Sequence, residues 1–94
     1  MVNILIVEDE QAIANLMYKS LTDEGYQCTI AYDGRQGADL IEQNSYDLAL
    51  LDIMLPEISG YELLEYIRPT GTPVIFITAR SSLHDRIRGL KKRS

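Results

Sequence analysis

The chain has 94 residues, a formal net charge of −5 and 46% hydrophobic residues, which is the composition of one small globular domain. No apolar run approaches the roughly 18 residues that a membrane-spanning helix needs, and the start lacks the basic cluster of a signal peptide. The single cysteine, Cys28, has no partner for an internal disulfide, and we expect it to be a small buried hydrophobe. These features predict a cytoplasmic protein with no membrane partner.

The basic residues are distributed unevenly along the chain. Of the nine Lys and Arg residues, six lie in the last fifteen positions: Arg80, Arg86, Arg88, Lys91, Lys92 and Arg93. A basic tail of this kind can bind nucleic acid. A solvated helix face followed by a frayed end is the simpler interpretation, and we favour it.

The first half of the chain alternates strand and helix patterns. Residues 3–7 are apolar and branched, which predicts a strand buried on both faces of a parallel sheet. A helical repeat predicts a helix over residues 11–23 that ends near Gly25. The expected repeat comprises Ile13, Leu16, Met17, Ser20 and Leu21. Residues 27–32 then have the pattern of a second strand.

The next elements follow in the same alternation. Asp33 stands in a turn and can cap a second short helix. Its expected inward residues are Ala38, Leu40 and Ile41. Residues 46–51 predict a third strand, which is more apolar than the second and therefore central.

The second half repeats this pattern. Residues 56–60 predict a loop and residues 61–68 a third helix, which Pro69 helps to end. Its expected inward residues are Leu63, Leu64 and Ile67. Residues 74–78 form the most strand-like stretch of the chain. A capping-box pattern, in which Asp85 follows Ser82, predicts a fourth helix that ends near Leu90.

The order of these elements indicates the fold class. Strands that alternate with helix-length connections pair in parallel with right-handed crossovers, so the sequence predicts a doubly wound α/β sheet. The flavodoxin-like strand order 2-1-3-4 would make the first and third strands neighbours.

Acidic side chains follow two of these strands where each strand ends. Glu8 and Asp9 follow the first strand and Asp52 follows the third. In the order 2-1-3-4 the three carboxylates converge and repel one another unless a cation lies between them. Mg²⁺, which prefers oxygen ligands, is the natural choice. Thr78, at the end of the fourth strand, adds a hydroxyl at the same edge.

A purely structural interpretation exists for some of these acids. Acidic residues near a helix N-terminus stabilise the helix dipole, and this alone could account for residues 8–10. Asp52 is harder to explain in this way, because an aspartate that ends an apolar strand is unfavourable without a partner. The combination of carboxylates and a hydroxyl at three strand ends favours a functional site.

Two other classes of site fit less well. An aspartyl phosphatase of the Asp-x-Asp type would need a second aspartate where Met54 stands. A nucleotide-binding domain would need a glycine-rich turn after the first strand, where residues 8–10 would instead repel phosphates.

Three segments resemble the receiver domains of bacterial response regulators. They are residues 4–10, residues 47–56 together with Ser59-Gly60, and residues 73–79. The resemblance runs from Val2 to about Leu90. Residues 78–80 and 85–90 resemble the subgroup that usually carries a winged-helix DNA-binding output domain.

The resemblance implies a role for each matching residue. Asp52 would accept a phosphoryl group from the phosphohistidine of a sensor histidine kinase. Asp9, Asp52 and the backbone carbonyl of Met54 would bind Mg²⁺, and Glu8 would act mainly through bound water. Thr78 would turn its hydroxyl toward the phosphoryl group as a switch. Such a domain is a phosphoacceptor with at most weak self-phosphorylation and autodephosphorylation, not an enzyme.

The sequence also departs from the family pattern. Receiver domains continue into a fifth strand with a Lys-Pro pair and a fifth helix, which have no counterpart here. We therefore interpret residues 1–94 as one truncated receiver domain, in which DNA would be contacted only through an output domain absent from the chain. Residues 74–78 would then form an uncharged sheet edge, which predicts a homo-oligomer. The alternative is a folded or oligomeric fragment that is impaired in phosphorylation and output.

Overall fold

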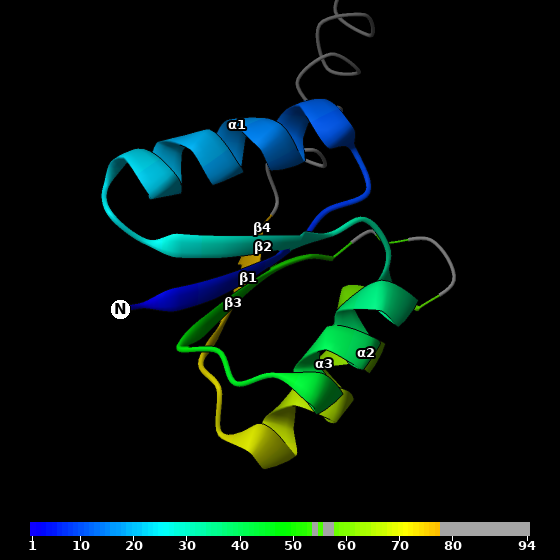
Figure 1. Cartoon of the computed structure of the whole chain (residues 1–94). Coiled ribbons are helices and arrows are strands. Elements are labelled where there is room, and N and C mark those ends of the chain that lie inside the picture. Colours follow the sequence, from blue (N-terminus) through cyan, green and yellow to red (C-terminus); the bar gives the residue numbers. More distant parts are fainter. Residues whose placement is uncertain (54, 56–57, 78–94) are drawn as a thin grey trace, which may run out of the picture.

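The computed structural model describes residues 1–53, 55 and 58–77, and these residues form a parallel sheet with helices on both faces (Figure 1). The elements in chain order are β1 (Asn3–Val7), α1 (Gln11–Asp23), β2 (Gln27–Ala31), α2 (Gly34–Gln43), β3 (Leu48–Asp52), α3 (Gly60–Ile67), the 3-10 turn η1 (Arg68–Thr70) and β4 (Val74–Ile77). The predicted fourth helix lies outside the described residues. In the described part of the chain, no helix is long and apolar enough to cross a membrane.

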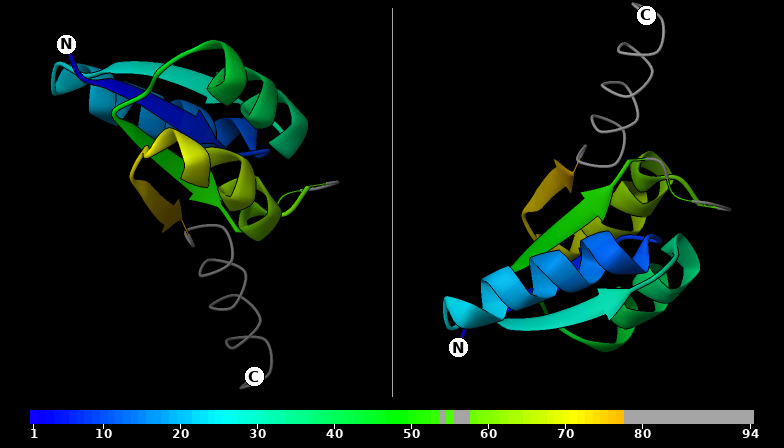
Figure 2. Two further views of the ribbon diagram at one scale, coloured as in Figure 1. Left: turned by 90° about the horizontal axis from the view of Figure 1, so that it is seen from below. Right: turned by 90° about the horizontal axis from the view of Figure 1, so that it is seen from above.

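The four strands of the sheet are all parallel, in the order β2-β1-β3-β4. This confirms the doubly wound fold and the strand order 2-1-3-4. Helix α1 covers one face and helices α2 and α3 cover the other (Figure 1). Seen from above, α1 lies across β1 and β2, while β3 and β4 continue beside it (Figure 2). Both central strands therefore end at the same edge of the sheet.

The central strand β1 is buried on both faces, as its sequence predicts. Leu5 and Val7 belong to the core cluster with residues of α2 and α3. Because side chains alternate along a strand, Ile4 and Ile6 point to the side of α1, and both are buried as well. This apolar centre holds the carboxyl end of β1 in a fixed place.

The inward face of α1 differs from the expected one. Ala14 is fully buried, whereas Leu16 is 67% exposed and Ser20 is also exposed. Among the described elements, the main contacts of α1 are with β2 and β1, and Ala14 lies on the buried side of the helix while Leu16 does not. Cys28 is only partly buried because β2 is an edge strand, and this burial raises the pKa of its thiol.

Among the described helices, α2 and α3 begin with side-chain caps. The Asp33 carboxylate accepts a hydrogen bond of 2.7 Å from the Gln36 amide, which confirms the predicted cap of α2. The Ser59 hydroxyl accepts one of 3.2 Å from the Glu62 amide at the start of α3. These caps fix where both helices begin, at the same edge of the sheet as the strand ends.

Loss of the α2 cap should destabilise the fold. Replacing an aspartate N-cap by alanine typically costs about 1 kcal/mol, because the amides of the first turn lose their acceptor. We expect Asp33→Ala to lower the free energy of unfolding by about this amount in urea denaturation. The control is Asp39→Ala, an exposed position on the same helix. Equal stabilities of the two variants would contradict the assigned cap.

Candidate metal centre

Three carboxylates meet at the carboxyl ends of the two central strands. Residue Val7 of β1 pairs with Leu51 of β3, so the next residue of each strand lies at the same edge. Glu8, Asp9 and Asp52 each place a carboxylate oxygen within 4.8 Å of the others. The convergence that the sequence predicts for these residues is therefore confirmed.

The three carboxylates differ in exposure. Glu8 is 0% and Asp52 is 1% exposed, whereas Asp9 is partly exposed. Burying ionised carboxylates close together is strongly unfavourable unless positive charge or hydrogen-bond donors compensate. One compensating donor is the Glu10 amide, which lies 3.0 Å from Oε2 of Glu8. A hard divalent cation would compensate more fully, since all three residues offer oxygen ligands.

The backbone around the cluster is fixed by close contacts. The amide of Glu8 donates a hydrogen bond of 3.0 Å to the carbonyl of Ala31, which ties the end of β1 to the end of β2. On the other side, the amide of Gly60 donates one of 3.2 Å to the carbonyl of Ile53. Both ends of the site are thus held by main-chain bonds.

Gly60 also belongs to the site, although glycine has no side chain whose chemistry could indicate this from the sequence. A Cβ at this position would lie 2.6 Å from the carbonyl oxygen of Asp52 and 2.9 Å from the Cα of Ile53. Any side chain would therefore push on the backbone that carries the Asp52 carboxylate. The signals in the sequence are the place of Gly60 next to the capping Ser59 and the inclusion of Ser59-Gly60 in the resemblance to receiver domains.

Two of the predicted site residues, Met54 and Thr78, lie outside the described residues. The described neighbours of Met54 are Ile53 and Leu55, and that of Thr78 is Ile77, which pairs with Asp52 in the register of β3 and β4. The roles of Met54 and Thr78 remain predictions.

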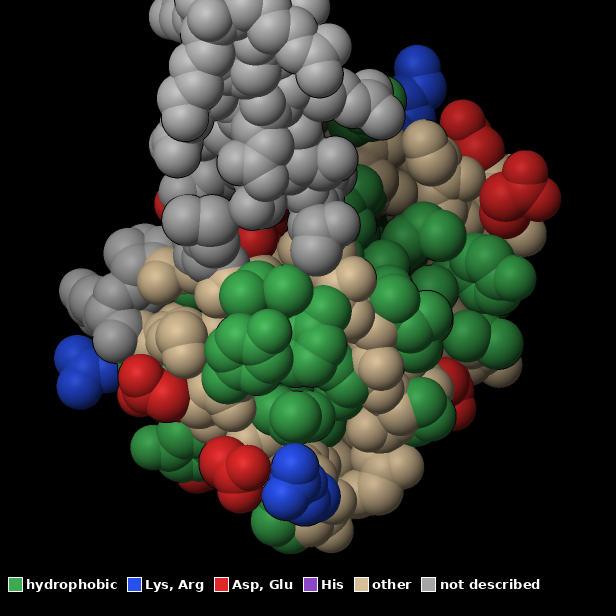
Figure 3. All heavy atoms as spheres, turned by 180° about the vertical axis from the view of Figure 1, so that it is seen from behind, with side chains coloured by type: hydrophobic (Ala, Val, Ile, Leu, Met, Phe, Trp, Pro, Cys, Tyr) green, Lys and Arg blue, Asp and Glu red, His purple; other side chains and the backbone are tan. Residues whose placement is uncertain are grey.

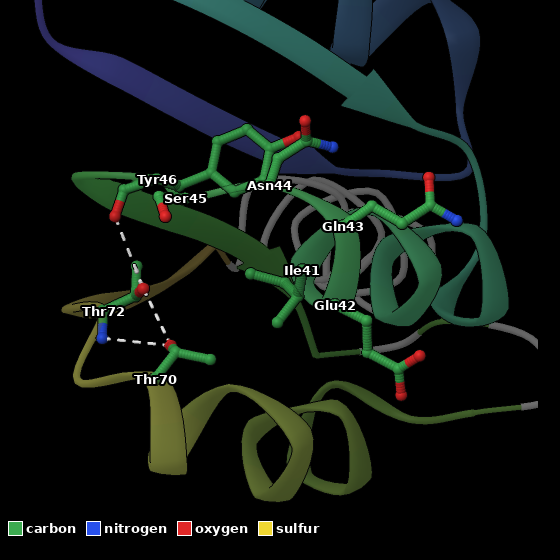
Figure 4. Close-up of a pocket in the computed structure, with 8 residues that line it drawn as sticks. All are labelled: Ile41, Glu42, Gln43, Asn44, Ser45, Tyr46, Thr70 and Thr72. Atoms are coloured by element: carbon green, nitrogen blue, oxygen red, sulfur yellow. Dashed lines mark hydrogen bonds between the residues drawn. The ribbon is translucent and has the colours of Figure 1, made fainter.

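A hollow of about 420 Å³ lies at the opposite end of the sheet, between the end of α2 and the turn before β4 (Figure 4). Its lining residues are Ile41, Glu42, Gln43, Asn44, Ser45, Tyr46, Thr70 and Thr72. The hydroxyl of Thr72 donates to the carbonyl of Tyr46, and the Thr70 hydroxyl accepts from the Thr72 amide (Figure 4). This hollow is formed at the amino ends of the strands, so it is separate from the carboxylate cluster.

The family model of the response regulator receiver domain matches residues 4–93. Among curated proteins, the response regulator ArlR of Staphylococcus haemolyticus is 46% identical over 91 residues, which are 96% of this chain and 42% of that protein. The transcriptional regulatory protein YkoG of Bacillus subtilis is 48% identical over 90 residues, 94% of this chain and 40% of that protein. The chain thus spans about two fifths of these relatives.

Solved structures agree with this match. The receiver domain of the Francisella response regulator 1452 has a TM-score of 0.78 at 33% identity, over 97% of this chain and 77% of that one. The response regulator TrrA of Thermotoga maritima, solved in complex with Mg²⁺-BeF, has a TM-score of 0.73 at 36% identity, over 81% of this chain and 66% of that one. The chain therefore belongs to the response regulator receiver domain family.

Proposed function

We propose that Asp52 is the phosphoacceptor of a two-component signalling pathway, and that its donor is the phosphohistidine of a sensor histidine kinase. The observation that carries this proposal is the cluster of Glu8, Asp9 and Asp52 at the carboxyl ends of β1 and β3. Family membership supports it, because receiver domains are signalling modules and the matched relatives include a protein named as a response regulator and one named as a transcriptional regulatory protein.

The proposed reaction transfers one phosphoryl group. A carboxylate oxygen of Asp52 attacks the phosphorus, the bond from phosphorus to the histidine nitrogen breaks, and that nitrogen keeps the electron pair and takes up a proton. The product is an acyl phosphate on Asp52. Transfer of this kind depends on positioning and on neutralisation of charge. Weak self-phosphorylation from small phosphodonors and slow hydrolysis of the product would follow from the same geometry.

Mg²⁺ is the cation that we propose for this site. Receiver domains bind Mg²⁺ at an acidic pocket, and two buried carboxylates beside a third suit a small hard cation. Asp9 and Asp52 would bind it directly, with the backbone carbonyl of Met54, and Glu8 would act through water. When bound, the ion offsets negative charge between the carboxylates and the phosphoryl group. The donor would approach from the side of Asp9, the partly exposed member of the cluster.

The remaining roles are proposals of the same kind. We propose that the Thr78 hydroxyl turns toward the phosphoryl group and so reports phosphorylation to the surface. Residues 1–94 would act as a receiver domain, and contact with DNA would belong to an output domain outside these residues. A histidine kinase that donates to this site would do so in the cytoplasm.

Metal binding provides the first test of the site. We expect Mg²⁺ to shift the NMR signals of residues 8–10 and 52–53. Loss of a group that only supports a metal ligand lowers metal affinity roughly tenfold. Asp9→Asn removes a proposed ligand itself, so we expect it to weaken the affinity for Mg²⁺ by more than that. Glu10→Gln is the matched control, because Glu10 is exposed and adjacent but outside the cluster. If both variants titrate like the parent, the proposed metal site is wrong.

Phosphorylation provides the second test. Incubation with Mg²⁺ and acetyl phosphate should add one phosphate to the intact mass of the chain, and Asp52→Asn should abolish the addition. Asp39→Asn, an exposed aspartate on α2, should react like the parent. The alternative of a folded fragment impaired in phosphorylation predicts no phosphate on the parent either.

We also propose that the chain associates with a second copy through β4. Within the described residues, β4 has a neighbour on one side only, which is β3. The carbonyl of Pro73 accepts a bond from the Ala49 amide, so by alternation Val74 and Phe76 direct their backbone groups to the open edge. The strand contains no charge or proline, which are the usual protections of an edge.

The side chains beside this edge are also apolar. Ile75 is 55% exposed, and on the other side the ring of Tyr61, which is 60% exposed, lies 5.2 Å from that of Phe76. Figure 3 looks onto the side of the molecule on which β4 lies and shows hydrophobic side chains gathered there. Because β4 itself carries no charge, two copies can pair edge to edge around a two-fold axis.

Light scattering tests this association. We expect a dimer or larger assembly at micromolar concentration, which Ile75→Lys should dissociate because it places a charge in the edge. Val2→Lys, at another exposed apolar position, is the control. Because each copy carries a net charge of −5, association should strengthen as salt rises. A monomer whose β4 amides are protected in hydrogen exchange would contradict the proposal.

A further inference from the structure

Gly60, at the start of α3, contacts the backbone at the end of β3, where the segment after Asp52 begins. This segment leaves β3 at Ile53, and seven residues later Gly60 donates its amide to the Ile53 carbonyl at 3.2 Å. Gly60 also packs directly against the carbonyl of Asp52. The position of this segment is therefore linked to the position of the Asp52 backbone.

Ile58, which precedes Gly60 by two residues, lies against Gly34, the first residue of α2. A Cβ at Gly34 would lie 2.6 Å from the carbonyl oxygen of Ile58 and 2.7 Å from its Cβ. Neither atom can be moved by a change of side-chain rotamer, so a side chain at Gly34 requires the segment or the helix to shift. Ile58 is itself packed against the hydrophobic core, which limits how far it can give way.

The start of α2 is also linked to the other half of the carboxylate cluster. It follows β2 directly, and the carbonyl of Ala31 at the end of β2 accepts the amide of Glu8 at 3.0 Å. The side chain of Asp33 caps the helix between these two contacts. The start of α2 is thus linked through Ala31 to the strand end that carries Glu8, and it contacts Ile58, which follows Asp52 in the chain.

We infer that Gly34 is a positioning residue of the phosphorylation site, which acts through its contact with Ile58. The close approach holds Ile58 at one distance from α2, and through Gly60, two residues further on, it holds the backbone of Asp52 relative to Glu8. This inference rests on the proposed function of Asp52, but the contact itself can be tested without phosphorylation. Misplacement of a reacting group by about 1 Å can lower a rate on the order of a hundredfold.

The test compares two glycine-to-alanine variants on the same helix. In Gly34→Ala the new methyl group meets the backbone of Ile58, whereas in Gly37→Ala it meets side-chain atoms of Val7 and Leu63 at 3.0 Å and 3.3 Å. Both changes crowd a buried position, but only the first pushes on the segment after Asp52. The readouts are hydrogen exchange of the Gly60 amide and the initial rate of phosphorylation by acetyl phosphate with saturating Mg²⁺.

We expect Gly34→Ala to speed exchange of the Gly60 amide and to lower the phosphorylation rate by about tenfold or more. Gly37→Ala should leave both close to the parent. If Gly34→Ala phosphorylates like the parent, or if Gly37→Ala is slowed equally, the inference is overturned.

A second variant covers the case in which Gly34→Ala does not fold. Ile58→Ala shortens the side chain that anchors the segment in the core, so Gly60 exchange should speed up and phosphorylation should slow. Parent-like values of both in Ile58→Ala would overturn the inference. If the parent chain accepts no phosphate, the proposed function fails, and the Gly60 exchange rates alone decide the positioning role of Gly34.

Discussion

The parallel pairing of β1 with β3 is the interaction on which the site depends. The register that pairs Val7 with Leu51 brings two strand ends, distant in the sequence, to one point. Both residues are fully buried in one core cluster, and Ile4 and Ile6 are buried on the other face of β1, so apolar contacts on both faces stabilise the pairing. A slip of one residue would exchange the side chains of the two faces and place Glu8 within the strand, so the packing of the core favours the observed register. The carboxylates are therefore brought together by hydrophobic packing and not by their own charges, which oppose it.

The carboxylate cluster lowers the stability of the fold, although the proposed function requires it. Glu8 and Asp52 are almost completely buried acids within 4.8 Å of each other and of Asp9, which is an unfavourable arrangement without compensation. A cation that binds the folded cluster, and not the unfolded chain, stabilises the fold by mass action. The proposed Mg²⁺ would therefore stabilise the folded cluster in addition to its role in the proposed phosphoryl transfer. Burial of apolar side chains against the sheet offsets the remaining unfavourable free energy of burying the carboxylates.

Backbone proximity is the second constraint on the site. Gly34 and Gly60 stand where any side chain would meet main-chain atoms at 2.6 Å. Their role here is small size and not conformational freedom, because neither has a positive φ. Gly34 lets the start of α2 approach Ile58 closely, and Gly60 lets the start of α3 approach the end of β3. The caps at Asp33 and Ser59 fix the same two helix starts, so the surroundings of Asp52 are set by sterics and hydrogen bonds together.

The sequence by itself determined the order of strands and helices, the buried character of β1, the cap at Asp33 and the acids at the strand ends, because local periodicity and residue chemistry encode these features. Only the tertiary structure decided the rest, because it depends on contacts between residues far apart in the chain. The exposure of Leu16 follows from which strands α1 covers, and no helical repeat contains that information. The burial of Glu8 and the contact of Gly34 with Ile58 arise only when β2, β3 and α2 meet at one edge of the sheet.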